Sequence, residues 1–194
     1  MYEVYLAADA LYEGRVTVPV LWDKKLGTIV NNESAEIIRM LNSQFNDLTG
    51  HTQDFYPERY RSEIDAINDR IYHDINNGVY KTGFATTQAV YDEEYSRVFA
   101  ALDWLEERLT QRTFLLGDSV TEADWRLFAT LVRFDSVYHG HFKLNRQKRS
   151  EFPRLSDYIE RLTAVPGVSE TINQDHIKAH YYGSHTSINP TGIV

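Results

Sequence analysis

The sequence predicts a mainly α-helical protein with a small β element, arranged as a β-β-α segment over residues 1–50 and an all-helical region over residues 51–194. Two short runs rich in β-branched residues, joined by a Gly-containing connection, lie between residues 15 and 30. After Gly50 the strand signals stop, and apolar residues recur at spacings of three and four. A two-stranded hairpin is marginal by itself, so we expect helices or further strands to cover it.

Composition and charge restrict the classes of function. The 194 residues include 20 Lys+Arg and 28 Asp+Glu, a formal charge of −8, which speaks against a nucleic-acid partner. No apolar run is long enough for a membrane span and the start has no secretory leader, so we expect a cytoplasmic protein that does not bind membranes. Cysteine is absent, which excludes disulfides, thiolate zinc sites and a cysteine nucleophile within this chain.

The first elements in the chain are the two strands of a hairpin. Its strands are predicted at Arg15–Trp22 and Thr28–Val30, with a turn at Asp23–Gly27. Pro19 is unusual inside a strand because proline removes a ladder donor. It is either an edge-strand proline, or it follows a cis bond that turns the backbone N–H and C=O of Val18 toward an added peptide strand.

A helix is expected next, opened by residues 31–34. Its apolar positions follow the 3.6-residue period: Ile37, Ile38, Leu41, Phe45 and Leu48. Glu33 and Ser34 stand at its start, where capping is the ordinary role of such residues. The unpaired N–H groups and the dipole of a helix start also favour a bound anion, which is the second interpretation.

The region after Gly50 predicts an all-helical domain with its own periodic core. One helix begins at Pro57 and ends near Gly78, and a second long helix follows it. Their apolar positions are Ile64, Ile67, Ile71 and Ile75, then Val98, Leu102, Leu105 and Leu109. A third helix is capped by Thr121 and Asp124 in a capping-box pattern. Shorter helices are expected over residues 153–164 and 168–180, and a loop from residue 183 to the end.

Five strings carry a resemblance to a known family: RVTVPVLWD at 15–23, NNESAEIIRM at 31–40, NNGVYKTGFAT at 76–86, TEADWRLF at 121–128 and NPTG at 189–192. They resemble the glutathionyl-hydroquinone reductases, the xi class of omega-like glutathione transferases, nearly from end to end. The resemblance implies the C-terminal part of a thioredoxin-like domain followed by an all-helical glutathione transferase C-terminal domain. That family carries a Cys-Pro-Trp nucleophile motif upstream, so we expect this chain to be a fragment that is inactive alone.

The resemblance also implies ligands and contact residues. Glutathione is the expected co-substrate, quinone and hydroquinone conjugates are the expected substrates, and the expected assembly is a homodimer without a metal. The family's glutathione contacts match six residues of this chain: Arg15, Val16, Thr17, Val18, Glu33 and Ser34. Ser34 would hold the γ-glutamyl carboxylate of glutathione, and Glu33 would pair with its ammonium group.

Three tyrosines of the helical region are the candidate catalytic residues. A lone tyrosine is ordinarily an amphipathic ring at a core margin. By the resemblance, Tyr80 exchanges a proton with the quinol, while Tyr138 and Tyr181 lower the pKa of the nucleophile. A phenol suits both roles, because it donates to a developing phenolate or thiolate and keeps its own proton at neutral pH.

Other clusters have ordinary explanations. The pairs His176/His180 and His139/His141 lack further ligands for a metal. The basic stretch 143–149 suits a solvated helix face or a small-anion contact. An alternative function also stays open: a non-catalytic, truncated glutathione transferase homologue that acts as a binding or dimerisation module.

Overall fold

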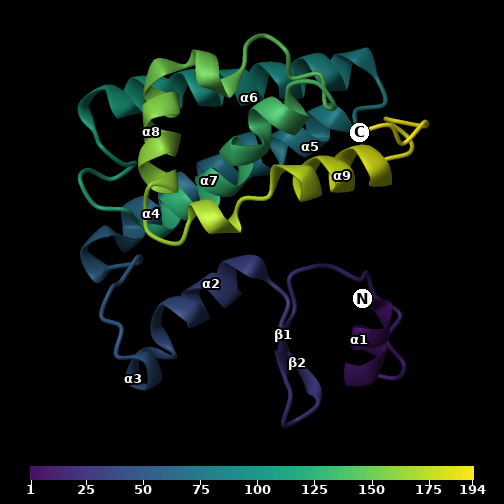
Figure 1. The fold of residues 1–194 in the computed structure, drawn as a ribbon, viewed down its shortest axis with the longest axis vertical. Helices are drawn as coiled ribbons and strands as arrows, with labels where there is room; N and C mark the ends of the chain where they lie inside the picture. The colour runs from purple at the N-terminus through teal and green to yellow at the C-terminus, as the bar shows by residue number, and fades with distance from the viewer. The chain divides into compact units, whose positions relative to one another are not determined.

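The computed structural model describes all 194 residues and divides them into two compact units, residues 1–56 and residues 57–194 (Figure 1). The fold is mainly helical with one two-stranded sheet, so the predicted fold class is confirmed. None of the helices combines the length and the apolar character that crossing a membrane requires.

The first unit holds the sheet and three helices. In chain order its elements are α1 (Tyr2–Ala8), β1 (Leu21–Asp23), β2 (Thr28–Asn31), α2 (Ser34–Ser43) and α3 (Asn46–Thr49). The two strands are antiparallel, with Trp22 opposite Ile29. Asp23 closes the predicted turn, because its Oδ1 accepts from the Leu26 N–H at 2.9 Å and Gly27 adopts a φ of 65°.

The predicted strand Arg15–Trp22 is wrong in its extent. Only its last residues pair, as β1, and residues 15–20 form no strand. The reason is physical: β2 is four residues long and Pro19 has no N–H, so the chain offers residues 15–20 no ladder. The peptide bond between Val18 and Pro19 is cis, as one of the two interpretations of this proline predicts.

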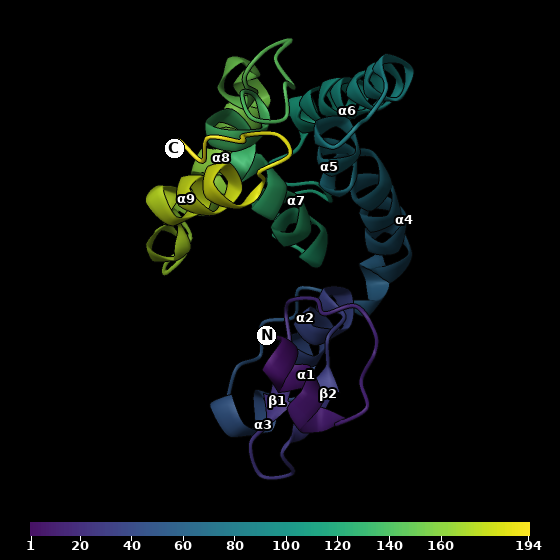
Figure 2. The same cartoon turned by 90° about the vertical axis from the view of Figure 1, so that its right-hand side faces the viewer.

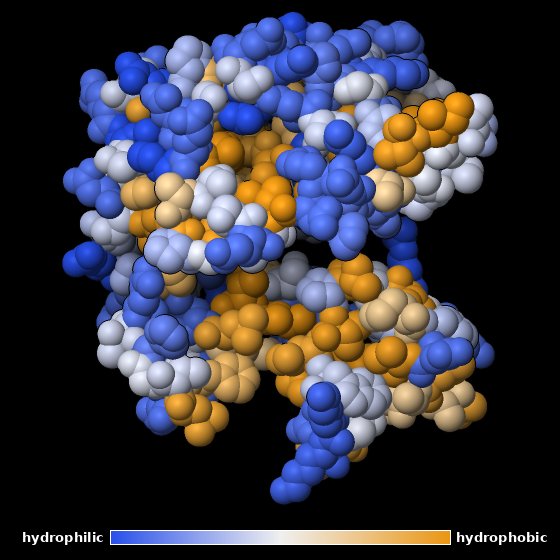
Figure 3. All heavy atoms as spheres, viewed as in Figure 1, coloured by the Kyte–Doolittle hydropathy of each residue, from blue (hydrophilic) through white to orange (hydrophobic).

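The helix predicted to run through Leu48 is interrupted. It ends at Ser43, and the short α3 begins at Asn46. Of its apolar positions only Ile37 is buried, whereas Leu41 is 57% exposed and Leu48 is 84% exposed. Figure 3 shows apolar side chains spread over the visible face of this unit. These residues therefore do not form a core within the first unit.

The second unit is a helical bundle with two π-helical turns. Its helices are α4 (Arg61–Ile71), α5 (Gly78–Gly83), α6 (Gln88–Arg108), α7 (Glu122–Arg133), α8 (Pro153–Thr163) and α9 (Gln174–Ser184). The π-helical turns are Tyr72–Asn76 and Phe134–Tyr138, and single 3-10 turns lie at Glu58–Tyr60, Leu109–Gln111, Arg149–Glu151 and Ser169–Thr171. Figure 2 shows α7 between α4 and α8.

The predicted core of this bundle is confirmed. All eight apolar positions of the first two predicted helices are buried: Ile64, Ile67, Ile71, Ile75, Val98, Leu102, Leu105 and Leu109. The first predicted helix was expected to end near Gly78. In the structure α4 ends at Ile71, and the π-helical turn Tyr72–Asn76 then connects it to α5. A Cβ at Gly78 would lie 2.8 Å from Val98, so glycine allows α5 to lie close to α6.

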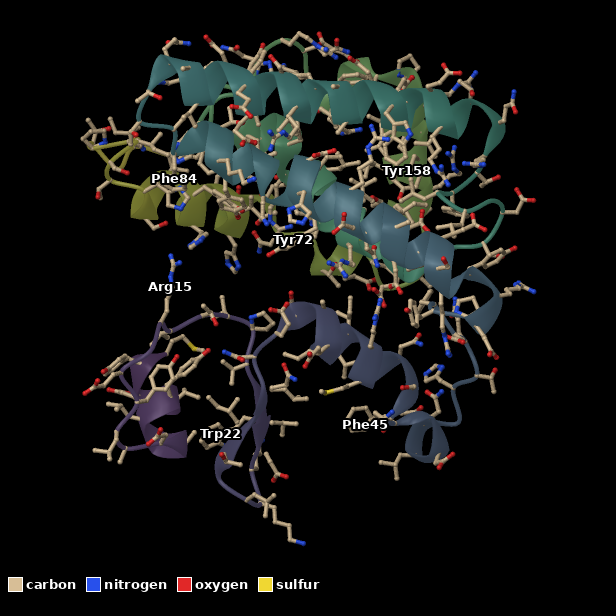
Figure 4. The ribbon with its side chains drawn as sticks, turned by 180° about the vertical axis from the view of Figure 1, so that it is seen from behind. Arg15, Trp22, Phe45, Tyr72, Phe84 and Tyr158 are labelled. Carbon is tan, nitrogen blue, oxygen red and sulfur yellow. The ribbon has the colours of Figure 1, made fainter.

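A buried carboxylate fixes the start of α7. Asp124, which is fully buried, accepts from the Thr121 N–H at 2.7 Å and completes the predicted capping box. Its other oxygen accepts from the Leu115 N–H and from the Tyr158 hydroxyl, each at 2.9 Å. Figure 4 locates Tyr158 inside the bundle. Asp124 thus joins α7, α8 and the loop before α7.

Candidate functional site

Three hydroxyl groups from distant parts of the second unit meet in one chain of hydrogen bonds. Tyr80 comes from α5, Tyr138 from the end of a π-helical turn and Tyr181 from α9. The Tyr181 hydroxyl lies 2.8 Å from that of Tyr138 and 2.5 Å from that of Tyr80. The three tyrosines predicted as catalytic are therefore neighbours, although 43 and 101 residues separate the bonded pairs.

Both π-helical turns of the unit lie next to this cluster in the chain. Phe134–Tyr138 ends at a tyrosine of the cluster, and Tyr72–Asn76 leads directly into the helix of Tyr80. A π-helical turn inserts a residue into a helix and so changes the face to which the following side chains belong. The Asn76 side chain donates to the Arg126 carbonyl of α7 at 3.0 Å, which anchors the entry to α5.

The three hydroxyl groups run from the core to the surface. Tyr138 is 2% exposed and Tyr181 6%, whereas Tyr80 is 39% exposed. Burial raises the pKa of Tyr138 far above that of free tyrosine, and the neighbouring phenols add to this effect. Burial also raises the pKa of Tyr181, against the hydrogen bond that it receives from Tyr138. Both inner phenols therefore keep their protons at physiological pH.

Burial also sets the direction of the hydrogen bonds. A phenol carries one hydrogen, and the Tyr138 hydroxyl has its closest partner in Tyr181, with the Tyr80 phenol as its other hydrogen-bonding neighbour. If Tyr138 did not donate to Tyr181, its own hydrogen would be buried without its closest acceptor, which costs about 1–3 kcal/mol. Tyr181 must then donate to Tyr80 for the same reason. The Tyr80 hydroxyl therefore accepts a hydrogen bond from Tyr181 and can donate its own hydrogen to a group at the protein surface.

Aromatic rings frame the cluster. The Phe142 ring stacks on Tyr138 at 5.4 Å between centroids and meets Tyr80 edge-on at 5.5 Å. A Cβ at Gly83 would lie 2.2 Å from the Phe142 ring, so this position has room only for glycine. Phe84, 44% exposed, packs against Phe142 at 5.5 Å and lies beside α9 in Figure 4. Tyr80 and Phe84 together present an exposed aromatic surface.

The predicted glutathione contacts lie in the first unit, around the buried Tyr5 of α1. The Tyr5 hydroxyl donates to the Thr17 carbonyl at 2.9 Å and lies 3.1 Å from the Thr17 hydroxyl. The Asn32 side chain donates to the same Tyr5 oxygen at 3.1 Å. The hydrogen bonds with Thr17 and Asn32 lower the pKa of Tyr5. Tyr5 thus fixes the segment with Thr17 beside the start of α2.

One predicted contact in this segment, Val18, presents unpaired backbone groups. Val18 is 70% exposed, and its backbone N–H and C=O form no hydrogen bond within the chain. Arg15 is exposed and its side chain projects from the loop (Figure 4), while Val16 is half-buried and contributes no side-chain hydrogen bond. The Val18 backbone is therefore free to pair with an extended peptide.

Glu33 and Ser34 stand at the start of α2, as predicted. Glu33 is the N-cap, and its Oε1 accepts from the Ala35 N–H at 3.3 Å, which is the ordinary capping role. Ser34 is exposed, and its hydroxyl has no partner within the chain. The helix start therefore keeps the hydroxyl and the N–H group of Ser34 free for an anion, whereas Glu33 occupies the N–H of Ala35.

Sequence reasoning missed several residues that build these sites. The missed residues are Tyr5, Asn32, Phe142 and His185. Tyr5 lies in α1, a seven-residue helix with no apolar period to find it. The sequence predicted Asn32 only as one of the residues that open a helix. Phe142 and His185 contribute by ring packing, which produces no regular spacing in the sequence.

The histidine pairs and the basic stretch are placed differently from the tyrosines. His176 and His180 are exposed on α9, and no group of three or more His, Asp or Glu side chains gathers in a metal-binding arrangement. The stretch 143–149 is not a helix face: residues 143–148 are a loop and Arg149 begins a 3-10 turn. Arg146 pairs with Asp103, and Arg149 pairs with Asp135 at 3.5 Å. The next helix, α8, begins at Pro153, so few residues remain in which the basic stretch could form a separate helix.

Comparisons with known proteins find similarity to the glutathione transferases. Residues 88–161 match the family of glutathione S-transferase C-terminal domains. The chain is 57% identical over 194 residues to the glutathionyl-hydroquinone reductase PcpF of Sphingobium chlorophenolicum, covering 100% of this chain and 62% of that protein. This chain thus spans less than two thirds of that relative's length.

Solved structures give the same result. The glutathione-bound structure of YqjG, a glutathione transferase homolog from Escherichia coli K-12, matches with a TM-score of 0.98 and 52% identity, covering 100% of this chain and 63% of that one. The glutathione transferase Xi 1 from Trametes versicolor matches with a TM-score of 0.95 and 49% identity, covering 100% of this chain and 68% of that one.

Proposed function

Because the chain belongs to the xi class of glutathione transferases, we propose that it serves the glutathione-dependent reduction of glutathionyl-hydroquinones to hydroquinones. In this proposal the first unit holds glutathione and the second unit supplies the tyrosines. The relative from Sphingobium bears the name of this activity, and the relative from Escherichia coli was solved with glutathione bound.

The proposed reaction exchanges one sulfur bond for another. A thiolate attacks the sulfur of the glutathionyl-hydroquinone, a disulfide forms with the glutathionyl group, and the bond between sulfur and the ring carbon breaks. The ring carbon takes a proton, which releases the hydroquinone, and a second glutathione then resolves the disulfide. This chain contains no cysteine, so the attacking thiolate has to come from outside these 194 residues.

The observation that carries the proposal is the one-way chain of tyrosine hydroxyls. In the direction that burial favours, Tyr138 donates to Tyr181, which donates to Tyr80, so the exposed hydroxyl of Tyr80 keeps its hydrogen free to donate outward. A hydroxyl that already accepts a hydrogen bond is a stronger donor. We assign Tyr80 as the proton donor to the quinol ring system, and Tyr138 and Tyr181 as donors that act through Tyr80 to stabilise negative charge at the site.

The glutathione site is proposed on the six residues of the first unit. The Val18 backbone would pair with the cysteinyl backbone of glutathione, and Arg15, Val16 and Thr17 would border the same strand. Ser34 and the N–H groups of the α2 start would hold the γ-glutamyl carboxylate. Glu33 would exchange its capping bond for the ammonium group of the peptide.

Binding of a hydroquinone conjugate to two matched variants tests this function. Replacing Tyr80 by Phe removes the outward donor, and we expect the affinity for a glutathionyl-hydroquinone to fall roughly two- to tenfold, the value of one hydrogen bond. Tyr72→Phe is the control, because Tyr72 is comparably exposed and its hydroxyl has no partner. Equal affinities of the two variants in calorimetric titrations would refute the role of Tyr80.

The absence of cysteine favours a second candidate, a non-catalytic binding or dimerisation module. A homodimer fits both candidates. The module would bind glutathione or hydroquinone conjugates without exchanging sulfur bonds, even when a thiol-bearing partner segment is joined to it. Turnover by the joined protein that is lost on Tyr80→Phe supports the enzyme, and tight binding without turnover supports the module.

A further inference from the structure

Two histidines form a hydrogen-bonded pair at the edge of the tyrosine cluster. His141 Nε2 lies 3.1 Å from His185 Nδ1. His141 is buried in the turn after the π-helical turn Phe134–Tyr138, and His185 follows the last residue of α9. The pair thus joins the end of α9 to the segment that carries Tyr138.

The His185 ring touches the groups that hold the tyrosines. It meets the Tyr181 ring edge-on at 5.4 Å and lies nearly parallel to Phe142, at 5.8 Å and 11°. Phe142 in turn contacts Tyr138 and Tyr80. A displacement of His185 therefore reaches all three tyrosines, directly through Tyr181 and indirectly through Phe142.

The bond between the two rings depends on their protonation. One ring nitrogen must donate and the other accept, so at least one imidazole has to be neutral at the bonded nitrogen. Burial lowers the pKa of both histidines, and each is opposed further by a neighbouring imidazole: His185 for His141, and His180 for His185. Both effects favour the neutral pair.

The surroundings of the pair contain no opposing charge. The titratable side chains in ring contact with it are His180, Tyr181 and Tyr182 of α9, and the phenols of Tyr138 and Tyr80 lie beyond the Phe142 ring. Neither imidazole forms an ion pair with a carboxylate. Protonation of both rings would place two positive charges side by side with no anion to balance them.

We propose that His141 and His185 are positioning residues that hold Tyr181 between Tyr138 and Tyr80, so that the outward donor of Tyr80 is fully formed only while at least one ring of the pair is neutral. This proposal rests on the proposed function of the tyrosines. It places the pH dependence of hydroquinone binding below the ordinary histidine pKa of about 6.5, where no tyrosine titrates.

Isosteric amides test the proposal without removing the bond. A Gln at 141 places its amide where Nε2 lies, and an Asn at 185 places its amide where Nδ1 lies, so the double variant His141→Gln/His185→Asn keeps a hydrogen bond that does not titrate. His176→Gln is the matched control. His176 is exposed on α9, the helix that ends next to His185, and its ring has no partner. Equal melting temperatures at pH 8 verify that the variants fold alike.

Two readouts separate this proposal from the function it rests on. In the free protein, the NMR signal of the Tyr181 phenol carbon should shift between pH 8 and pH 5.5 with the midpoint of the His185 signal. The shift should persist in His176→Gln and disappear in the double variant. A Tyr181 signal that stays constant while His185 titrates overturns the proposal, whether or not any hydroquinone binds.

The second readout is affinity for a glutathionyl-hydroquinone. The wild type and His176→Gln should lose roughly two- to tenfold in affinity between pH 8 and pH 5.5, the effect of one lost hydrogen bond, and the double variant should not. A wild-type affinity that is constant over this range also overturns the positioning role. A complete lack of binding at pH 8 refutes the proposed function instead, and the Tyr181 signal then decides the positioning role alone.

Discussion

Adding one methyl group at Gly83 should disturb the tyrosine cluster more than any surface change. An ideal Cβ at this position lies 2.2 Å from the Phe142 ring, and ordinary contact begins at 3.4 Å. The ring must therefore retreat by at least 1.2 Å from α5, and it leaves its stacked position on Tyr138. Overpacking of this kind costs about 1–3 kcal/mol of unfolding free energy.

Gly183 supplies a matched control for this change. Both glycines lie in the last two residues of a helix, and neither has a positive φ. A Cβ at Gly183 meets nothing within 4 Å, so Gly183→Ala should gain about 0.5–1 kcal/mol from helix propensity alone. Gly83→Ala gains the same amount from helix propensity but is destabilised by the overpacking. Its unfolding free energy should therefore be about 1–3 kcal/mol lower than that of Gly183→Ala.

Urea denaturation of the two variants measures this difference, and titration with a glutathionyl-hydroquinone measures its effect on the site. We expect Gly83→Ala to bind more weakly than the wild type, because Phe142 also supports Tyr80. Equal unfolding free energies for Gly83→Ala and Gly183→Ala would refute the close packing of α5 against Phe142.

Three further predictions follow from the buried polar groups and the missing thiol. Asp124→Ala removes the acceptor of four buried donors and should cost at least about 3 kcal/mol in urea denaturation, against about 1 kcal/mol for Tyr158→Phe; similar losses would contradict the shared acceptor. Because burial lowers the pKa of both His141 and His185, the unfolded chain binds more protons, so the unfolding free energy should rise with pH through the histidine range and flatten above it. A stability that is constant or falls between about pH 5 and 7 would contradict this linkage. The chain alone, with glutathione and a glutathionyl-hydroquinone, should release no hydroquinone above the buffer rate, since it has no cysteine; chromatographic detection of product would refute the thiolate route.

Local signals predicted the bundle well because each acts within a few residues. The isoleucine spacing from Ile64 to Ile75 reflects one buried helix face, and the Thr121/Asp124 pattern reflects one helix start. The strand Arg15–Trp22 was overestimated because pairing depends on a partner elsewhere in the chain, and β2 reaches only its last residues. The π-helical turn Tyr72–Asn76 has no sequence period of its own.

The candidate site required the structure. Spacing gives no reason for Tyr80, Tyr138 and Tyr181 to meet, and only the family resemblance selected them. The direction of their hydrogen bonds depends on burial, which the sequence does not state. His185 could not be found because its role comes from a partner 44 residues away.

The direction of the tyrosine chain is the central claim, and the affinity for substituted phenols tests it most directly. Phenols of one size and decreasing pKa carry increasing negative charge on oxygen, so an outward donor at Tyr80 should bind them with increasing affinity. Tyr80→Phe should flatten this dependence, while Tyr72→Phe should keep it. An affinity that falls as the phenol becomes more anionic would mean that Tyr80 accepts rather than donates, and would contradict the account.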